Sequence, residues 1–285
     1  MLLRLPQELI EMIIDEVDEK DRRKLLSRCS VVSRNWLHRF RRLLFKSVCI
    51  CEPALDDRQL IPPASPGESK VHSFLQLLNH SPEIAACVQS LSIMGRVREH
   101  CSNVTLKFIN SPVLKISDLS QYLACLPNLS SLELHSMFLQ EYRTISTTHH
   151  PVYSLKTLRL INLQGHHGLG MQSCSILGLF GLFTDIHSLV LDGLFIGVDG
   201  TTRLEQKVNI AHVQVVAGRQ YSCVDLLLDR VASGQKVIHY ELFLSDLNQP
   251  DDYEGIAHII RRAREGQLRV LEFNLRRFES WNHNG

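Results

Sequence analysis

The sequence predicts an α/β protein in two parts, a small N-terminal helical head and a longer body of parallel strands covered by helices. Two observations predict this plan. In the head, apolar residues recur at the helical period over residues 5–45. In the body, helical patterns are each followed by an alternating apolar segment of the form L-x-x-L-x-L, which is typical of a short strand. We divide the chain into a head at 1–50, a loop or linker at 51–70 and a body at 71–285.

The head is predicted to hold three short amphipathic helices. Pro6 suits the first turn of the first helix, because a residue there needs no N–H. A second pattern opens at Asp21, and Ser30 can cap the third helix. Helices this short need tertiary packing or a partner to be stable. Their apolar stripes consist of Leu9, Ile10, Ile13, Ile14 and Val17, then Leu25 and Leu26, then Val32, Trp36, Phe40 and Leu43.

The head resembles an F-box, whose pattern is L-P-x-E-L…I…L…V-x-R-x-W…L-F. The matching residues are Leu5-Pro6-Gln7-Glu8-Leu9, Ile13, Leu25-Leu26, Val32-Ser33-Arg34-Asn35-Trp36 and Phe45. Ser33 and the charged DEKDRRK stretch depart from the usual family residues. The resemblance implies a three-helix F-box that docks on a Skp-type adaptor, which links to a cullin–RING ubiquitin ligase. Trp36 is the expected anchor, because buried aromatics dominate interface energetics. The implied adaptor-binding residues are Leu5, Pro6, Leu9, Ile13, Leu25, Leu26, Val32, Trp36 and Phe45. Alternatively, the same stripe is only the internal core of an N-terminal helical cap.

The body repeats a helical pattern followed by L-x-x-L-x-L, which resembles an irregular leucine-rich-repeat solenoid with parallel strands. The asparagine ladder of regular repeats is nearly absent: Asn162 follows one strand, but Ser136 and Gly193 occupy comparable places. A less regular α/β fold is the alternative. The expected strands lie at 88–93, 129–134, 154–160, 186–191 and 268–273, with weaker matches at 213–215 and 238–242.

Composition narrows the possible classes of function. The net charge of +1 gives no strong field for nucleic acid or an acidic membrane. No apolar run reaches 18 residues, so we expect no membrane span. The first residues do not form a signal peptide, and the eight cysteines are expected to stay reduced in the cytoplasm or nucleus. The basic clusters lack interleaved aromatics, so we interpret them as solvated helix faces.

The motif search predicts no catalytic site, no cofactor and no metal site. The pairs His149-His150 and His166-His167 have no accompanying metal-ligand pattern. Cys49-x-Cys51 lacks a second cysteine pair, although in a strand its two thiols would share one face. No phosphate-binding loop or nucleophile elbow occurs. We therefore expect a binding protein and not an enzyme.

Taken together, the head and body resemble fungal-type F-box proteins, and the stretch His80-Ser81-Pro82-Glu83-Ile84 resembles an early segment of those chains. The resemblance implies a substrate-receptor subunit of a Skp/cullin/F-box-type ubiquitin ligase, with its target protein bound by the body. The alternative is a leucine-rich-repeat-like interaction scaffold with no role in a ligase.

Overall fold

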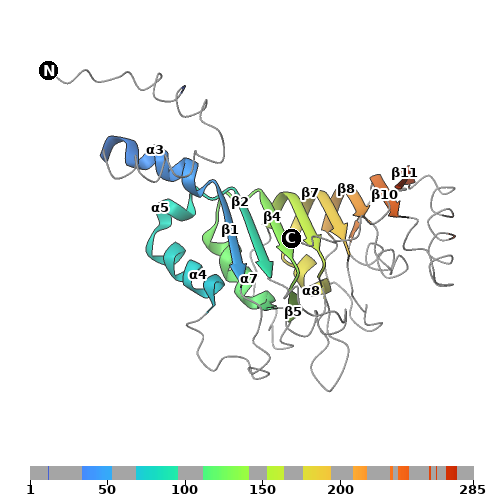
Figure 1. The fold of residues 1–285 in the computed structure, drawn as a ribbon, viewed down its shortest axis with the longest axis horizontal. Helices are drawn as coiled ribbons and strands as arrows, with labels where there is room; N and C mark the ends of the chain where they lie inside the picture. The colour runs from blue at the N-terminus through green and yellow to red at the C-terminus, as the bar shows by residue number, and fades with distance from the viewer. Residues whose placement is uncertain are drawn as a thin grey trace, which may run out of the picture.

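The computed structural model contains a large parallel sheet with helices along one side. It describes residues 34–52, 69–95, 112–140, 153–163, 176–193, 208–216, 232–233, 237–243 and 268–274, and the single positions 12, 257 and 261. Figure 1 shows the strands of the sheet side by side in chain order. The described part of the chain is a mixed α/β structure with parallel pairing, as the sequence predicts.

The main sheet has nine strands in the order β1-β2-β4-β6-β7-β8-β10-β11, and β9 pairs with β8. A second sheet pairs β3 with β5, and every pairing in both sheets is parallel. Parallel neighbours require a crossover between them, which gives the chain a repeating path. The strands are β1 Ser47–Glu52, β2 Ser90–Gly95, β3 Val113–Lys115, β4 Ser131–His135, β5 Phe138–Gln140, β6 Tyr153–Ile161, β7 Phe183–Asp192, β8 Val208–Val216, β9 Ala232–Ser233, β10 Val237–Phe243 and β11 Leu268–Asn274.

Leucines line up in a row across the sheet. Leu91 of β2 lies opposite Leu132 of β4, which lies opposite Leu158 of β6 and then Leu189 of β7. All four side chains are 0 % exposed. Successive side chains of a strand point to opposite faces, so this row lies on one face and its chain neighbours on the other. Burying each leucine contributes about 1.5–3 kcal/mol, so the row is a main source of stability.

Helices cover the face that carries this row. Residues of α4 (Lys70–His80), α7 (Ile116–Cys125) and α8 (Ile176–Phe180) belong to the same core as the inward-facing strand residues. In α4 the buried positions Val71, Leu75 and Leu78 recur at the helical period. The Ser69 hydroxyl caps α4 by accepting a hydrogen bond from the His72 N–H. The opposite face of the sheet, which we call the open face, is not covered by these helices.

Three strands of the sheet end in left-handed turns. Ser136, Asn162 and Gly193 directly follow β4, β6 and β7 and have φ of 52°, 49° and 58°. The Ser136 N–H donates to the Ile161 carbonyl at 2.9 Å, and the Asn162 N–H donates to the Asp192 carbonyl at 2.7 Å. Glycine and asparagine adopt this conformation most readily. Hydrogen bonds between the backbones of neighbouring strands therefore continue past the strand ends, although serine, asparagine and glycine occupy the three turns.

The start of the sheet was not predicted. Residues 47–52 form β1, which pairs along its whole length with β2, whereas the sequence analysis placed residues 47–50 in the head and 51–52 in a linker. The missed signal is the alternation of Val48, Ile50 and Glu52 with Ser47, Cys49 and Cys51. The rest of the predicted linker, up to residue 68, lies outside the described residues. The head and the sheet therefore meet at α3 (Arg34–Phe45), which ends two residues before β1 begins.

Candidate functional site

The first candidate site is the junction between α3 and the sheet. Phe40, in the second half of α3, is only 1 % exposed. The Lys46 carbonyl, between α3 and β1, accepts hydrogen bonds from the N–H groups of Gln89 and Ser90, both at 2.9 Å. Phe45 is half-buried and packs against the core of the body. The end of α3 is therefore held by the first two strands.

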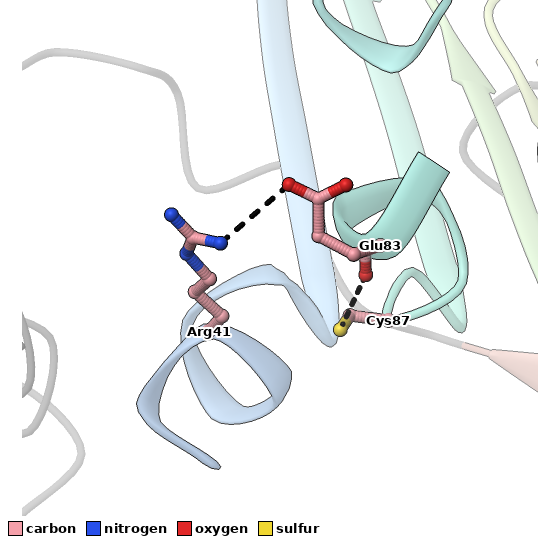
Figure 2. Close-up of polar contacts among 3 residues, drawn as sticks. All are labelled: Arg41, Glu83 and Cys87. Carbon is pink, nitrogen blue, oxygen red and sulfur yellow. Dashed lines mark hydrogen bonds and ion pairs between the residues drawn. The ribbon is translucent and has the colours of Figure 1, made fainter. Parts of the chain in front are cut away.

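An ion pair joins α3 to α5 (Pro82–Ala85), as Figure 2 shows. An Arg41 guanidinium nitrogen lies 3.5 Å from a Glu83 carboxylate oxygen, and the two side chains are 38 % and 51 % exposed. The Cys87 thiol donates to the Glu83 carbonyl at 3.1 Å, which holds the turn that follows α5. The sequence analysis did not predict the Arg41–Glu83 pair, and it interpreted Arg41 as part of a solvated helix face. An ion pair at the surface contributes little to the free energy of folding, so we expect this pair to constrain the direction of α3 relative to α5 more than to stabilise the fold.

Most predicted adaptor-binding residues lie outside the described residues. Of the nine, the structure describes the side chain of Phe45 alone, and it places Trp36 in α3 by its backbone. Phe45 contacts the body, so part of its apolar surface is already covered within the chain. The remaining seven are Leu5, Pro6, Leu9, Ile13, Leu25, Leu26 and Val32, and their role in docking stays a prediction.

A buried carboxylate fixes the far end of β1. Glu52 is 7 % exposed and accepts two hydrogen bonds of 2.6 Å, from the Ser69 hydroxyl and the Val71 N–H. Val71 lies in the first turn of α4, where free N–H groups and the helix dipole favour a negative charge. Glu52 therefore anchors β1 to the first covering helix. The sequence analysis missed this role because Glu52 and Ser69 both lie within the predicted linker, at 51–70.

The second candidate site is the open face of the sheet. One row across it runs Cys49, Ser92, Glu133, Arg159, Val190 and Gln214, in register from β1 to β8. The next row runs Cys51, Met94, His135, Ile161, Asp192 and Val216. Glu133 and Arg159 lie 3.5 Å apart and form an ion pair. The face therefore mixes polar, charged, sulfur and aliphatic groups.

No group of three or more His, Cys, Asp or Glu in the described ranges is arranged to hold a metal ion. Across those same ranges, no helix has both the length and the apolar character that crossing a membrane requires. Among the described residues, Glu52 is the most buried carboxylate, and two donors already engage it.

Comparison with known proteins identifies the head. Residues 2–48 match the F-box domain family, a range that includes all of α3 and ends inside β1. No curated protein and no solved structure matches the chain. The match covers each of the nine residues that the sequence analysis assigned to the adaptor interface. Residues 2–48 of this chain are therefore an F-box domain, joined through α3 to a parallel sheet.

Proposed function

We propose that this chain is the substrate-receptor subunit of a Skp/cullin/F-box-type ubiquitin ligase. The observation that carries the proposal is the F-box domain at residues 2–48. F-box domains bind Skp-type adaptors in cullin–RING ligases, so the head supplies the ligase side of the receptor. In this proposal the nine predicted residues, with Trp36 as the anchor, form the adaptor interface, and the chain works in the cytoplasm or nucleus.

We assign target recognition to the body, which we interpret as an irregular leucine-rich-repeat-like solenoid. Three features support this interpretation: the strands follow chain order, the leucine row crosses four strands, and left-handed turns end β4, β6 and β7. A solenoid buries one face of its strands beneath helices and offers the other as an extended binding surface. The target protein then contacts the open face around Glu133 and Arg159 or the loops at its rim.

The mechanism is proximity, and the chain supplies no catalytic group of its own. Holding a target lysine beside an activated ubiquitin carrier turns a bimolecular encounter into an effectively intramolecular one. The α3 junction supports this mechanism, because Phe40 is buried and Lys46 is bonded to the residues that lead into β2. The end of the F-box and the first strands therefore move together. An adaptor bound to the head has a set orientation relative to the open face.

The test is binding of a purified Skp-type adaptor to the full chain, measured by calorimetry or by co-purification after co-expression. Trp36→Ala should weaken binding about 30-fold, which corresponds to an interface anchor worth about 2 kcal/mol. Arg42→Ala is the matched control, because Arg42 lies on the same helix and its side chain is exposed. Circular dichroism checks that each variant is folded.

Two outcomes are decisive. Adaptor binding that is lost with Trp36→Ala and kept with Arg42→Ala supports the receptor function. A folded chain that binds no Skp-type adaptor rules it out and leaves the interaction scaffold without a ligase role. If the receptor function is supported, affinity purification with mass spectrometry identifies the target by comparing the intact chain with Trp36→Ala. A true target co-purifies with both forms, whereas the adaptor co-purifies only with the intact chain.

A further inference from the structure

Three sulfur atoms meet on the open face where the sheet begins. Cys49 Sγ lies 3.9 Å from Cys51 Sγ and 3.4 Å from Met94 Sδ. The two cysteines share a face because they are two residues apart in β1, and Ile50 between them is buried on the other face. Met94 lies on β2 directly opposite Cys51. The parallel pairing of β1 with β2, which the sequence analysis did not predict, therefore adds a third sulfur to the Cys49-x-Cys51 pair.

The spacing of the two thiols matches that of two ligands on one metal ion. Two sulfurs bonded at about 2.3 Å with trigonal or tetrahedral angles are about 3.8–4.0 Å apart. The Cys49–Cys51 separation of 3.9 Å falls in this range without movement of the backbone. The Met94 sulfur is closer, at 3.4 Å, and its unbranched side chain can adjust to open the third position. Both thiols are free, with Cys49 exposed and Cys51 half-buried, so an ion can reach them from solvent.

The donor set determines the class of metal. Two thiolates and a thioether are soft ligands that select Cu(I), whereas oxygen donors suit Mg²⁺ and Ca²⁺. No described cluster supplies the three His, Cys, Asp or Glu ligands on which a zinc site is usually built. We propose that Cys49, Cys51 and Met94 bind one soft monovalent metal ion of the Cu(I) class. Binding releases the two thiol protons to solvent, leaves the metal as Cu(I) and gives the site a net charge of −1, since Met94 is neutral.

The site must compete with protons. Burial, together with the neighbouring Cys51 thiol, raises the pKa of the Cys49 thiol above its ordinary value. The thiol is therefore protonated at neutral pH, and the metal displaces a proton to bind. Affinity for the ion should consequently rise with pH. This site lies just beyond the F-box match and its chemistry does not rest on the receptor function.

The experiment is an anaerobic titration of the full chain with Cu(I) held by the chromophoric chelator bicinchoninate, with ascorbate as the reductant. The chain should withdraw Cu(I) from the chelator, and the double variant Cys49→Ser/Cys51→Ser should take up one equivalent less than the intact chain. Met94→Leu keeps the side-chain volume and should lower the affinity at least about tenfold, since loss of even an outer-shell partner costs that much. X-ray absorption of the loaded chain should show sulfur neighbours only.

The matched controls are Cys87→Ser and Cys125→Ser, which remove free thiols that lie outside the three-sulfur cluster. Both should bind as many equivalents as the intact chain, and circular dichroism checks the fold of every variant. The proposal is wrong if the double variant takes up as much Cu(I) as the intact chain. It is equally wrong if Met94→Leu holds the ion as tightly as methionine does.

Discussion

The interior of the sheet and the α3 junction are held together in different ways. In the interior, the leucine row of Leu91, Leu132, Leu158 and Leu189 is wholly buried and spans four strands. At the junction, buried Phe40 is accompanied by half-buried Phe45 and by an exposed ion pair from Arg41 to Glu83. We therefore expect the interior to set whether the body folds and the junction to hold α3 against the first strands. Substitutions in the two regions should separate stability from orientation.

The largest expected effect is in the interior. Leu158→Ala on the central strand β6 should lower the free energy of unfolding by about 3 kcal/mol, because it removes a 0 % exposed side chain and leaves a cavity. Urea denaturation followed by circular dichroism measures the change. Arg159→Ala, the next residue on the open face, is the control and should cost less than about 1 kcal/mol. Equal losses for the two variants would mean that the two faces of the sheet do not differ as described.

The second effect is at Glu52, where the first strand meets the first covering helix. Glu52→Ala should cost about 2 kcal/mol, since it removes the acceptor of the Ser69 hydroxyl and the Val71 N–H inside the protein. Urea denaturation again provides the value. Glu83→Ala removes a largely exposed carboxylate and should change stability by less than about 1 kcal/mol. A cost at Glu52 no larger than that at Glu83 would argue against the anchoring role.

The body was easier to predict than the junction because its pattern is local. Leu158 and Leu160 fall at the spacing of a half-buried strand, and a short window of sequence is enough to place them inside. The strands of the main sheet lie in chain order, which agrees with the predicted recurrence of a helix followed by a strand. The F-box was also accessible, because residues 2–48 keep the family's order and spacing.

The junction could not be predicted because its contacts join residues that are distant in the chain. Arg41 meets Glu83, and Cys49 meets Met94, only because β1 pairs with β2. Nothing in either local sequence specifies the partner. Glu52 is likewise a charged residue at the edge of a predicted linker, and charged residues are seldom buried unless paired. Its burial depends on the position of the α4 N-terminus, which no local pattern contains.

A third prediction concerns the left-handed turns that end the strands. Gly193→Ala should cost about 1–2 kcal/mol, because Gly193 has a φ of 58° and an added Cβ would overlap the Asn162 side-chain oxygen. Ser136→Gly, at a φ of 52°, is the control and should be close to neutral, since relief of strain offsets the greater freedom of the unfolded chain. Thermal unfolding measures both variants. A neutral Gly193→Ala would show that the turn can relax into another conformation.

A fourth prediction isolates the ion pair at the junction. Arg41→Ala should change the free energy of unfolding by less than about 0.5 kcal/mol, because both partners are partly exposed and water screens the pair. A double-mutant cycle with Glu83→Ala, measured at low and high salt, gives the coupling between them. The coupling should shrink as salt is added. A coupling energy above about 2 kcal/mol would show that the pair contributes substantially to stability. The junction and the interior would then not differ in the way proposed.

The last prediction concerns Tyr122, a residue of α7 that stacks on Phe74 of α4 with ring centroids 6.4 Å apart and whose substitution should cost no stability near neutral pH. Its hydroxyl is buried near the Leu75 backbone, without a hydrogen bond of good geometry among the described residues. Tyr122→Phe keeps the stacked ring and removes a polar group that has lost its water. Stability at pH 7 should therefore be unchanged or rise by up to about 1 kcal/mol.

The difference in stability between Tyr122→Phe and the intact chain should increase at alkaline pH. Burial raises the pKa of Tyr122 above the ordinary tyrosine value of 10.0, so the folded state keeps its proton at a pH where the unfolded chain loses it. The stability that the tyrosine contributes is complete below pH 10 and falls as the pH rises further, because the unfolded state then binds fewer protons. Tyr122→Phe has no proton to lose, so its advantage over the intact chain should grow above pH 10 in urea denaturation at stepped pH. If the free energies of unfolding of the two proteins change in parallel up to pH 11, solvent reaches this hydroxyl. The interior beside α4 and α7 would then be less closed than the buried leucine row implies.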